Sequence, residues 1–447
     1  MTRKLFGTDG VRGQANSYPM TADIALKLAA AAGRYFRKDQ KVHRAVIGKD
    51  TRRSSYMFEN AMTGGFTSTG MNVFLLGPVP TPAVGMLTRS MRADVGVMIS
   101  ASHNPHYDNG IKFFGPDGYK LSDVAEAEIE KLVMSESDLA QPENIGSAKR
   151  IDDALGRYIE FAKTAFPRQR LLDGMKIVVD CANGAAYKAA PVVLWELGAE
   201  VISIGVSPNG FNINADCGST YPNKAAEAVV AHGADCGICL DGDADRLMLI
   251  DEKGQVADGD QIMGLIAQKW ASEGHLAHNT LVATVMSNMG LEKYMQGQGL
   301  TMLRTGVGDR YVVQAMKEGG FNLGGEQSGH IVMRDYVTTG DGLIAGLQFL
   351  GALVQSGKRA SELARVFDPY PQILKNVRYN VGADPMNNAY VTQAIADGEA
   401  ALAMNGRLLV RKSGTEPLVR VMGECEDAGL LQSVISDIVG AVQTSAG

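Results

Sequence analysis

The stretch Cys236-Gly-Ile-Cys-Leu-Asp-Gly-Asp-Ala-Asp-Arg-Leu-Met-Leu-Ile250 places a short acidic segment between two apolar runs. Both runs are too short for helices and are typical of buried strands. Between them, Asp241, Asp243 and Asp245 alternate, and alternate residues of an extended segment point the same way. Three carboxylates brought together repel one another unless a hard cation holds them. The pattern therefore predicts a metal site at the end of a strand.

A calcium-binding EF-hand loop is the main alternative for this segment, since Asp stands at its positions one, three and five and Glu252 at position twelve. However, Arg246 occupies the sixth position, where that loop needs glycine, and strands rather than helices are expected on both sides. A metal-free acidic turn is the second alternative. The position of Arg246 indicates a further role, because Mg²⁺ with an adjacent guanidinium neutralises a phosphoryl group during transfer.

Length and composition exclude several classes of protein. The 447 residues exceed a single hydrophobic core and predict three or four domains. A net charge of -6 without a basic run argues against nucleic-acid binding. The sequence shows neither an apolar signal core nor the ~18 continuous apolar residues of a membrane span, so we expect no membrane partner and a cytoplasmic location. The five cysteines fit a reducing compartment, and Cys236 and Cys239 are interpreted as core residues.

Strands and helices are expected to alternate in three successive blocks, each with an apolar strand that runs into a polar loop. The strands and their loops are residues 94–99 with 100–105, 236–240 with 241–245, and 321–323 with 324–330. Further strands are expected at 176–180 and 280–285, and helices at 21–37, 189–197 and 259–270. Alternation of this kind predicts parallel sheets with helices on both faces and ligands beyond the carboxyl ends of the strands. All three loops should therefore face one site.

Polar segments at 134–150, 251–258 and 368–371 are expected to contain linkers between domains. The predicted domains are residues 1–150, 151–255, 256–368 and 369–447. The first three are expected to be consecutive α/β domains with mixed or parallel sheets. The last, with strands at 407–411 and 418–422, is expected to be a small α+β domain. The predicted fold class of the chain is therefore α/β.

Ser102 lies in Ala101-Ser-His-Asn-Pro105, directly after the first of these strands. A serine hydroxyl needs a base, or prior phosphorylation, to carry chemistry. A turn or helix-cap role is the alternative that the local sequence leaves open. Lys112 follows closely and could act as an acid or a base if it is desolvated, although an exposed lysine is the usual case.

Glu326, Ser328 and His330 alternate along the third loop, a pattern that suits recognition of sugar hydroxyls. A buried polar network explains the alternation equally well. The nearby stretch Gly340-Asp-Gly-Leu-Ile-Ala345 satisfies a loose dinucleotide-binding pattern. Asp341 at the start of a helix accounts for it as well, and no acidic residue in a matching context supports the dinucleotide.

The segment Arg411-Lys-Ser-Gly-Thr-Glu-Pro417, together with Arg420, is typical of an anion-binding loop. Hydroxyl groups and backbone N–H groups at a glycine turn bind phosphate, and arginines bind it bidentately. It is not a Walker A loop, because G-x-x-x-x-G-K-[ST] does not occur in the chain. The segment predicts a phosphate site in the last domain.

The motifs S-A-S-H-N-P, D-G-D-A-D-R, G-E-Q-S-G-H and R-K-S-G-T-E-P, in this order, resemble the α-D-phosphohexomutase family over essentially the whole chain. Each motif is weak alone, but the joint pattern is highly specific. The stretches Phe6-Gly-Thr-Asp-Gly-Val-Arg-Gly13 and Thr305-Gly-Val-Gly-Asp-Arg-Tyr311 are similar to the bacterial branch that acts on glucosamine phosphates. The resemblance implies a four-domain, heart-shaped architecture.

The activity that the resemblance implies is interconversion of glucosamine 6-phosphate and glucosamine 1-phosphate, a step toward cell-wall amino sugars. Ser102 would carry a phosphate and, with Asp241, Asp243 and Asp245, would bind one Mg²⁺ per chain. A hexosamine 1,6-bisphosphate would be the intermediate and activator, and the chain would be a monomer or homodimer. A phosphomannomutase/phosphoglucomutase is the alternative. A Mg²⁺-dependent phosphatase, which would release inorganic phosphate, and a non-catalytic binding module are more distant ones.

Matching the family motifs position by position implies the remaining roles. The residues around the transferring phosphoryl group would be Ser102, His103, Lys112 and Arg246. The substrate-binding residues would be Arg12, Glu326, Ser328, His330, Arg411, Ser413, Gly414, Thr415 and Arg420. Gly306 stands where the family usually has lysine, so one expected cation is missing. Ala244 replaces a common glycine, and we expect its φ to be below zero.

Overall fold

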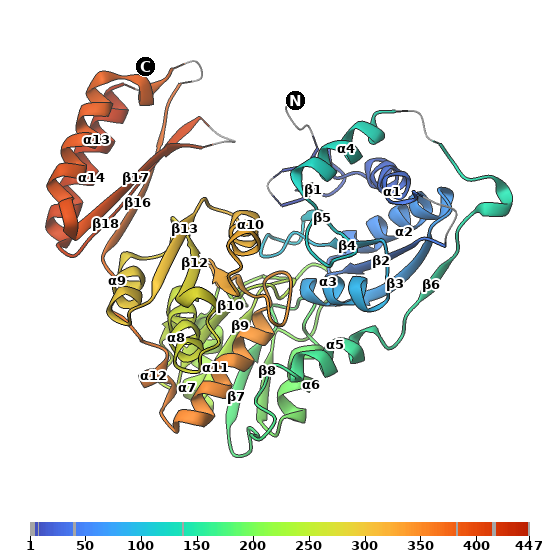
Figure 1. Cartoon of the computed structure of the whole chain (residues 1–447), viewed down its shortest axis with the longest axis horizontal. Coiled ribbons are helices and arrows are strands. Elements are labelled where there is room, and N and C mark those ends of the chain that lie inside the picture. The colour runs from blue at the N-terminus through green and yellow to red at the C-terminus, as the bar shows by residue number, and fades with distance from the viewer. Residues whose placement is uncertain are drawn as a thin grey trace. The chain divides into compact units, whose positions relative to one another are not determined.

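The computed structural model describes residues 5–7, 9–38, 42–135, 138–380, 383–413 and 417–445. The chain divides into two compact units (Figure 1). Unit 1 comprises Met1–Thr284 and Met302–Val366, and unit 2 comprises Val285–Thr301 and Phe367–Gly447. Three sheets are associated with unit 1 and one with unit 2. The three α/β layers and the small α+β layer confirm the predicted fold class.

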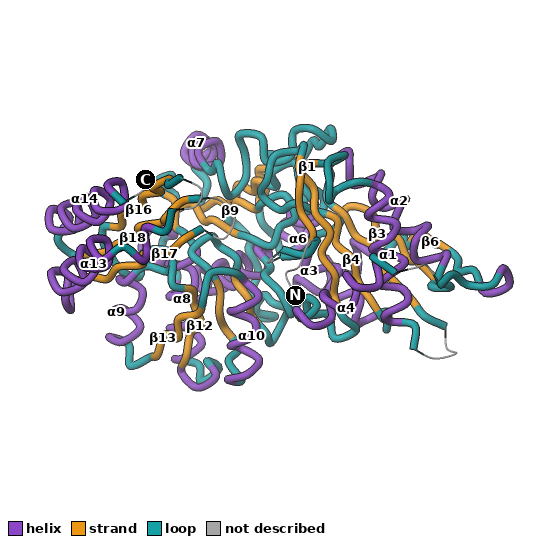
Figure 2. Tube along the Cα trace, turned by 90° about the horizontal axis from the view of Figure 1, so that it is seen from above, coloured by secondary structure: helices purple, strands orange, loops and turns teal. Residues whose placement is uncertain are grey.

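The first sheet has six strands in the order β1-β5-β4-β2-β3-β6. They are β1 (Val11–Gln14), β2 (Arg44–Lys49), β3 (Asn72–Pro78), β4 (Val95–Ile99), β5 (Asp108–Phe114) and β6 (Ala148–Arg150). β4, β2, β3 and β6 are parallel, β5 pairs antiparallel with β4, and the edge strand β1 pairs antiparallel with β5. Figure 2 shows the strands of this sheet side by side, with β1, β4 and β3 labelled at successive positions across it. Because β4 ends at Ile99, the Ser102 loop leaves from its carboxyl end.

Four helices cover the first sheet, with α1 (Ala22–Phe36), α2 (Arg53–Ser68) and α4 (Asp123–Val133) on one face and α3 (Thr81–Ser90) on the other (Figure 1). Apolar residues of α1, such as Leu28 and Ala32, pack in one core with Val73 and Val97 of the strands. This core fixes β2 and β4, and thereby the two loops at their carboxyl ends.

The second sheet has the order β11-β10-β9-β7-β8. Its strands are β7 (Lys176–Asp180), β8 (Glu200–Ile204), β9 (Cys236–Leu240), β10 (Leu247–Asp251) and β11 (Val256–Ala257), and its helices are α5 (Ala154–Lys163), α6 (Ala189–Glu196) and α7 (Asn223–His232). β7, β8 and β9 are parallel, whereas β9, β10 and β11 form an antiparallel meander. Strand order reverses at β7, and ligands of open α/β sheets bind beyond the carboxyl ends at such a point.

The third sheet has the order β13-β12-β14-β15. Its strands are β12 (Thr280–Thr284), β13 (Thr301–Thr305), β14 (Leu323–Gly325) and β15 (Ile331–Met333), and the associated helices are α8 (Gly259–Ser272), α10 (Asp309–Gly319), α11 (Gly342–Ser356) and α12 (Ala360–Leu363). β14 begins two residues later than the expected strand at 321–323. Asn322 precedes it; its side chain accepts from Ala277 N and donates to His275 O, and its carbonyl oxygen accepts from Arg334 N just after β15.

Unit 2 contains a three-stranded antiparallel sheet, β16-β18-β17, with three helices. The elements are α9 (Met289–Gly297), β16 (Gln372–Arg378), α13 (Ala389–Leu402), β17 (Gly406–Lys412), β18 (Leu418–Cys425) and α14 (Ala428–Thr444). Val419 and Val421 of β18 pack against Val434, Ile435 and Ile438 of α14. Of the predicted phosphate-binding segment, Arg411 lies on β17 and Arg420 on β18, whereas residues 414–416 lie outside the described residues.

Two of the polar segments expected to contain linkers also contain strands. The polar stretch 251–258, expected as a linker, is a hairpin between β10 and β11. Part of the expected linker at 134–150 is β6, which pairs with β3 as an edge strand of the first sheet. Polar composition marks exposed edge strands as well as linkers, and only the pairing partner distinguishes them.

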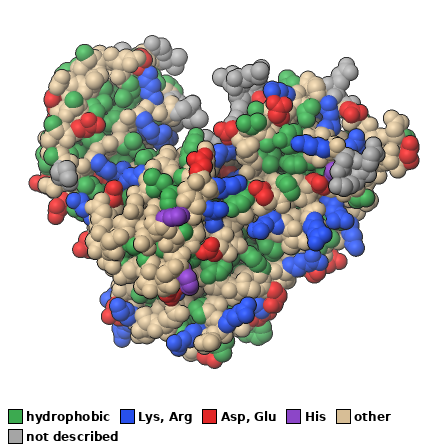
Figure 3. All heavy atoms as spheres, viewed as in Figure 1, with side chains coloured by type: hydrophobic (Ala, Val, Ile, Leu, Met, Phe, Trp, Pro, Cys, Tyr) green, Lys and Arg blue, Asp and Glu red, His purple; other side chains and the backbone are tan. Residues whose placement is uncertain are grey.

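The surface of the chain mixes both signs of charge. On the face drawn in Figure 3, Lys and Arg side chains are interspersed with Asp and Glu and form no single basic surface. Among the described residues, no helix is long and apolar enough to cross a membrane.

Candidate active site

The loops that follow β4, β9 and β14 meet in unit 1, as their predicted positions at strand ends require. Ser102 Oγ donates a hydrogen bond to Asp241 Oδ2 at 2.6 Å. Arg246 pairs with His330 in an antiparallel β-bridge. Three sheets, whose loops are far apart in sequence, therefore supply one group of side chains.

Ser102 is held in an unusual backbone conformation. It is buried, and its φ of 52° lies in the left-handed region that few residues other than Gly, Asn and Asp adopt. Its N–H donates to Ser100 Oγ at 2.9 Å, and its carbonyl oxygen accepts from Arg52 at 2.9 Å and from Asn214 at 2.8 Å. These bonds hold the main chain on both sides of Ser102 and direct its hydroxyl toward Asp241.

The three aspartates lie on a turn, not on an extended segment. Ala244 N donates to the Asp241 carbonyl oxygen, and Ala244 has a φ of 59°. The expectation of a negative φ at Ala244 is therefore wrong. Thr81 N, which donates to Asp243 O, and Gly342 N, which donates to Ala244 O, hold the turn from outside. These contacts keep alanine in a conformation that costs it roughly 1–2 kcal/mol.

The turn brings the carboxylates together. One oxygen each of Asp241, Asp243 and Asp245 lies within 4.8 Å of the others, and all three side chains are buried. Asp243 Oδ1 and Asp245 Oδ1 have no hydrogen-bond partner among the described residues. Burial, with the charges of Asp245 and Asp243, raises the pKa of Asp241 well above its usual range. A hard divalent cation would bind the unpartnered oxygens and offset the repulsion among the buried carboxylates. These residues therefore fit a metal ion.

Lys112 reaches this acidic group from β5, a strand that the sequence did not predict. Its Nζ lies 2.9 Å from Asp243 Oδ2, 3.4 Å from Asp245 Oδ2 and 3.5 Å from Asp9 Oδ2. Burial alone would lower the pKa of Lys112, but Asp243, Asp9 and Asp245 raise it above its ordinary value. Lys112 is therefore an ammonium group here, which stabilises negative charge and does not act as a base.

Arg12 and Arg246 lie near enough to His103 for their charges to affect its pKa. The Nε atoms of both arginines are buried and have no hydrogen-bond partner among the residues that the structure describes. Burial, followed by the charges of Arg246 and Arg12, lowers the pKa of His103 to about 4. His103 is therefore neutral at pH 7, with Nδ1 3.4 Å from Ser102 Oγ. Free guanidinium donors beside a neutral imidazole suit a phosphoryl group.

The third loop divides into two parts. Ser328 Oγ donates to Glu326 Oε2 at 3.4 Å, and Gly308 N donates to Glu326 Oε1 at 3.0 Å. His330 is buried, with Nε2 3.8 Å from Asp245 Oδ2 and 3.6 Å from Asp309 Oδ2. Glu326 and Ser328 thus remain candidates for binding sugar hydroxyls, whereas His330 lies against the acidic turn.

Sequence reasoning missed Lys120 and Asp309, which connect the first and third sheets. Lys120 Nζ lies 2.6 Å from Asp9 Oδ1 and 2.5 Å from Asp309 Oδ2. Against the effect of burial, Lys120 holds the pKa of Asp309 below its ordinary value. Asp309 begins α10 directly after the Gly306–Gly308 backbone, so this ion pair holds the segment that contacts Glu326. Asp309 lies in the Thr305–Tyr311 stretch that resembles the family, but no local sequence pattern indicates a role for Lys120.

The remaining predicted site residues lie in unit 2. Arg411 and Arg420 stand directly opposite each other on β17 and β18. Two like charges in this position are destabilising unless an anion accompanies them. Arg420 Nε is buried without a hydrogen-bond partner among the described residues, and Ser413 N donates to Leu418 O at 2.8 Å. Gly414 and Thr415 lie outside the described residues.

Comparison with known proteins agrees with this arrangement of loops. Models of the phosphoglucomutase/phosphomannomutase family match in order: alpha/beta/alpha domain I at residues 3–140, domain II at 156–254, domain III at 258–370 and the C-terminal domain at 374–441. The chain belongs to the phosphohexomutase family.

Relatives within the phosphohexomutases match the chain over its whole length. The phosphoglucosamine mutase of Paracoccus denitrificans is 69% identical over 447 residues, which are 100% of both chains. The phosphoglucosamine mutase of Dinoroseobacter shibae is 69% identical over 446 residues, again 100% of both chains.

Solved structures show the same phosphohexomutase fold. A phosphoglucomutase/phosphomannomutase family protein from Burkholderia thailandensis aligns with a TM-score of 0.81 at 23% identity, covering 99% of this chain and 97% of that one. The N-acetylphosphoglucosamine mutase of Aspergillus fumigatus, in complex with GlcNAc-6P and magnesium, aligns with a TM-score of 0.68 at 18% identity, covering 100% and 96%.

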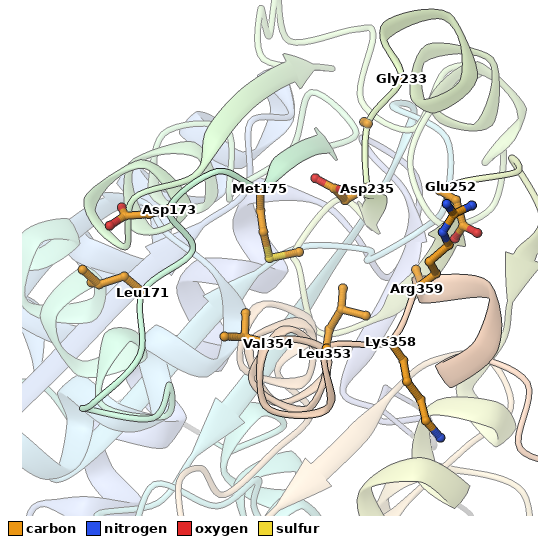
Figure 4. Close-up of a pocket in the computed structure, with 13 residues that line it drawn as sticks. Leu171, Asp173, Met175, Gly233, Asp235, Glu252, Leu353, Val354, Lys358 and Arg359 are labelled. Atoms are coloured by element: carbon orange, nitrogen blue, oxygen red, sulfur yellow. The ribbon is translucent and has the colours of Figure 1, made fainter.

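One hollow in this phosphohexomutase lies away from the acidic site. It has a volume of about 590 Å³, and Figure 4 shows Met175 directed toward Leu353 and Val354 across it. Met175 and Asp235, which line it, come directly before β7 and β9. The acidic turn follows the carboxyl end of β9, so the hollow lies at the opposite edge of the sheet.

Asp341 contacts the acidic turn through the backbone of the next residue and caps α11. Asp341 Oδ1 accepts from Ile344 N at 2.9 Å, and Tyr158 Oη donates to Asp341 Oδ2 at 3.0 Å. The cap explains the glycine-rich stretch at 340–345 without a dinucleotide. Burial raises the pKa of Asp341 to about 7.

We expect Asp341 to make stability fall as pH rises. Its pKa is raised in the folded chain, so between about pH 4 and pH 7 the folded state holds a proton that the unfolded state has lost. The cost is roughly 1.4 kcal/mol for each pH unit in that window. Asp341→Asn keeps a capping oxygen and cannot ionise. Its melting temperature should therefore rise relative to wild type from pH 5 to pH 7, whereas parallel pH profiles would contradict the assignment.

Proposed function

We propose that this chain is a phosphoglucosamine mutase, which interconverts glucosamine 6-phosphate and glucosamine 1-phosphate. Full-length identity of 65–69% to curated relatives of that name supports the substrate. Phosphoryl transfer is supported by one observation. The buried Ser102 hydroxyl donates a hydrogen bond to Asp241, which belongs to a group of three carboxylates. Phosphoryl transfer needs a nucleophile and charge neutralisation in one place.

The reaction uses Ser102 twice. Phosphorylated Ser102 gives its phosphoryl group to O1 of glucosamine 6-phosphate, so that the bond from phosphorus to Oγ breaks and the bond from phosphorus to O1 forms. His103, neutral at pH 7, is the candidate that accepts the proton of the O1 hydroxyl. The resulting 1,6-bisphosphate turns over and returns its 6-phosphoryl group to Ser102 Oγ. Glucosamine 1-phosphate is then released.

Charge neutralisation is the task of the surrounding residues. Lys112, Arg246 and Arg12 supply positive charge, the last two through guanidinium donors that have no partner within the described part of the protein. Asp241, Asp243 and Asp245, with phosphorylated Ser102, would hold one Mg²⁺. When bound, Mg²⁺ supplies a Lewis acid for the transferring group.

Binding of a phosphosugar explains how an acidic chain handles an anionic ligand. A hexose bisphosphate carries roughly three to four negative charges, and the net charge of the chain is -6. Arg411 and Arg420, with the segment 413–415, are proposed to bind the phosphate that does not react. Glu326, Ser328 and His330 are proposed to contact the sugar side of the ligand. A hexosamine 1,6-bisphosphate would serve as activator by phosphorylating Ser102.

The substrate is tested by ³¹P NMR with glucosamine 6-phosphate, glucose 6-phosphate and mannose 6-phosphate in parallel. We expect the 1-phosphate signal to form fastest from the amino sugar. Loss of one hydrogen bond to a charged group corresponds to roughly a ten- to hundredfold lower kcat/KM for the other two. Preference for glucose or mannose would indicate a phosphoglucomutase/phosphomannomutase. Release of inorganic phosphate would indicate a phosphatase.

A further inference from the structure

Arg52 lies beneath the Ser102 loop and is one of the largest fully buried side chains in the described residues. Its side chain has no solvent exposure. Arg52 stands at the N-cap of α2, three residues after the end of β2, and therefore on the first sheet. None of the sequence motifs includes Arg52, and its side chain bonds none of the three aspartates of the acidic turn.

All five N–H donors of the Arg52 guanidinium have an acceptor. Nε donates to Asp50 Oδ2 at 2.7 Å. One terminal nitrogen donates to the carbonyl oxygens of Pro105 and of Asp108, the latter at 3.1 Å. The other donates to the carbonyl oxygens of Ser102 at 2.9 Å and Asn104 at 2.7 Å. Four of the five bonds therefore go to the backbone of one seven-residue loop, and this loop carries the nucleophile.

Asp50 continues this network to the other side of Ser102. Its Oδ2 accepts from Ser100 Oγ at 2.7 Å, and Ser100 Oγ in turn accepts from Ser102 N at 2.9 Å. Asp50 Oδ1 accepts from Arg52 N and Ser55 Oγ. The Arg52–Asp50 pair therefore acts on both the carbonyl and the N–H of Ser102.

The second sheet contacts the same backbone. Asn214 Nδ2 donates to the carbonyl oxygens of Ser102 at 2.8 Å and Asn104 at 3.1 Å. Gly242 of the acidic turn approaches closely, and a Cβ there would lie 2.6 Å from Ser102 O. The peptide group after Ser102 is consequently enclosed by Arg52, Asn214 and the turn that holds the metal-binding aspartates.

We propose that Arg52, through its ion pair with Asp50, is a positioning residue for phosphoryl transfer at Ser102. It holds Ser102 in the left-handed conformation in which Oγ points at Asp241. The inference rests on the proposed function, because it assigns Arg52 to the same nucleophile. Arg52 touches neither the substrate nor the reacting atoms; its four carbonyl contacts define the loop on which they sit.

Arg52→Lys tests this role, since lysine keeps the positive charge but has only three donors on one nitrogen. It cannot satisfy four carbonyls in four directions and Asp50 together. We expect hydrogen exchange in the 100–109 peptide of the intact, ligand-free chain to become faster. Lys49→Met is the matched control. Lys49 is buried on β2 and pairs with Glu59, without a bond to the Ser102 loop. Its loss should lower the melting temperature and leave exchange at 100–109 unchanged.

The kinetic arm separates positioning from substrate binding. In Arg52→Lys, kcat should fall about 100-fold, the loss that a 1 Å misplacement of a reacting group causes. KM for glucosamine 6-phosphate should change little, because no substrate-binding residue is altered. The Lys49→Met control should keep both constants when rates are expressed per folded molecule. Wild-type exchange at 100–109, or a wild-type kcat, in Arg52→Lys would overturn the proposal.

The exchange measurement needs no substrate, so it remains decisive even if the proposed reaction is wrong. A wild-type chain without mutase activity would refute the proposed function, and the exchange of Arg52→Lys would still report whether Arg52 holds the loop. If Arg52→Lys does not fold, Asn214→Gly replaces it. Asn214 has a φ of 57°, which glycine adopts freely, so the change deletes only the amide that bonds Ser102. If hydrogen exchange at 100–109 is unchanged in that variant, the bonds that the loop carbonyl oxygens accept do not hold the loop, and the proposal is contradicted.

Discussion

Replacing Ser102 with glycine is expected to lower the kcat of the mutase reaction by at least about 10⁴-fold, as loss of a covalent nucleophile does in other enzymes. The buried hydroxyl donates to Asp241 at 2.6 Å, and no other serine occupies this position. Glycine is the sharper variant because φ at Ser102 is 52°. Alanine would keep the backbone strain that serine already carries at this φ, whereas glycine relieves it.

Ser102→Ala should be as inactive as Ser102→Gly, although less stable. Ser90→Ala, which removes an exposed hydroxyl at the end of α3 in the same domain, should keep full activity. Peptide mass spectrometry after incubation with a hexose 1,6-bisphosphate should find phosphate on the peptide that contains Ser102. Turnover by Ser102→Gly, or phosphate on a different serine, would refute the phosphoserine mechanism.

Asp243→Asn is expected to weaken Mg²⁺ binding by more than the roughly 10- to 100-fold that changes around metal ligands cause. Lys112 and Thr81 oppose the effect of burial and hold the pKa of Asp243 below its ordinary value. Asp243 is therefore ionised at neutral pH. Removing its charge leaves Lys112 beside fewer carboxylates and takes one anionic oxygen from the cation. Calorimetric titration with Mg²⁺ measures the loss.

Asp251→Asn is the matched control for that change. Asp251 is equally buried at the end of β10, and its Oδ1 accepts from Lys253 N and Gln255 N, which asparagine can replace. It should bind Mg²⁺ as the wild type does. Exhaustive treatment with EDTA should abolish turnover, and Mg²⁺ should restore it. Activity that survives chelation, or wild-type metal affinity in Asp243→Asn, would show that the acidic turn is not the metal site.

Local sequence order was sufficient to predict the fold class and most strands. β7 and β9 begin and end at the residues expected from their apolar runs, and α1 differs from its expected range by one residue at each end. A continuous apolar run indicates a buried strand by its composition alone, so the strand can be predicted without knowing which strand pairs with it. β5 was missed because Asn109 and Gly110 are typical of turns. They lie in a strand only because β1 and β4 pair with it on both sides.

The acidic group was predicted correctly, but the reason for its convergence was wrong. Alternation in an extended segment would have pointed Asp241, Asp243 and Asp245 the same way; the structure brings them together on a turn instead. The left-handed Ala244 at its centre is held by Thr81 and Gly342 from other parts of unit 1. The expected negative φ was based on the intrinsic backbone preference of alanine. These tertiary hydrogen bonds are stronger than that preference.

Sequence alone predicted which polar loops lie at the edge of a sheet, because a buried strand followed by polar residues is a local pattern that places those residues there. The same pattern follows β2, where Lys49, Asp50 and Arg52 could have been recognised. Only the tertiary structure decided what each group does. The protonated state of Lys112, the ion pair of Lys120 with Asp309, and the five bonds of Arg52 depend on partners that are distant in sequence. Charge and hydrogen-bond energies depend on distance and burial, and both are fixed only when the sheets pack together.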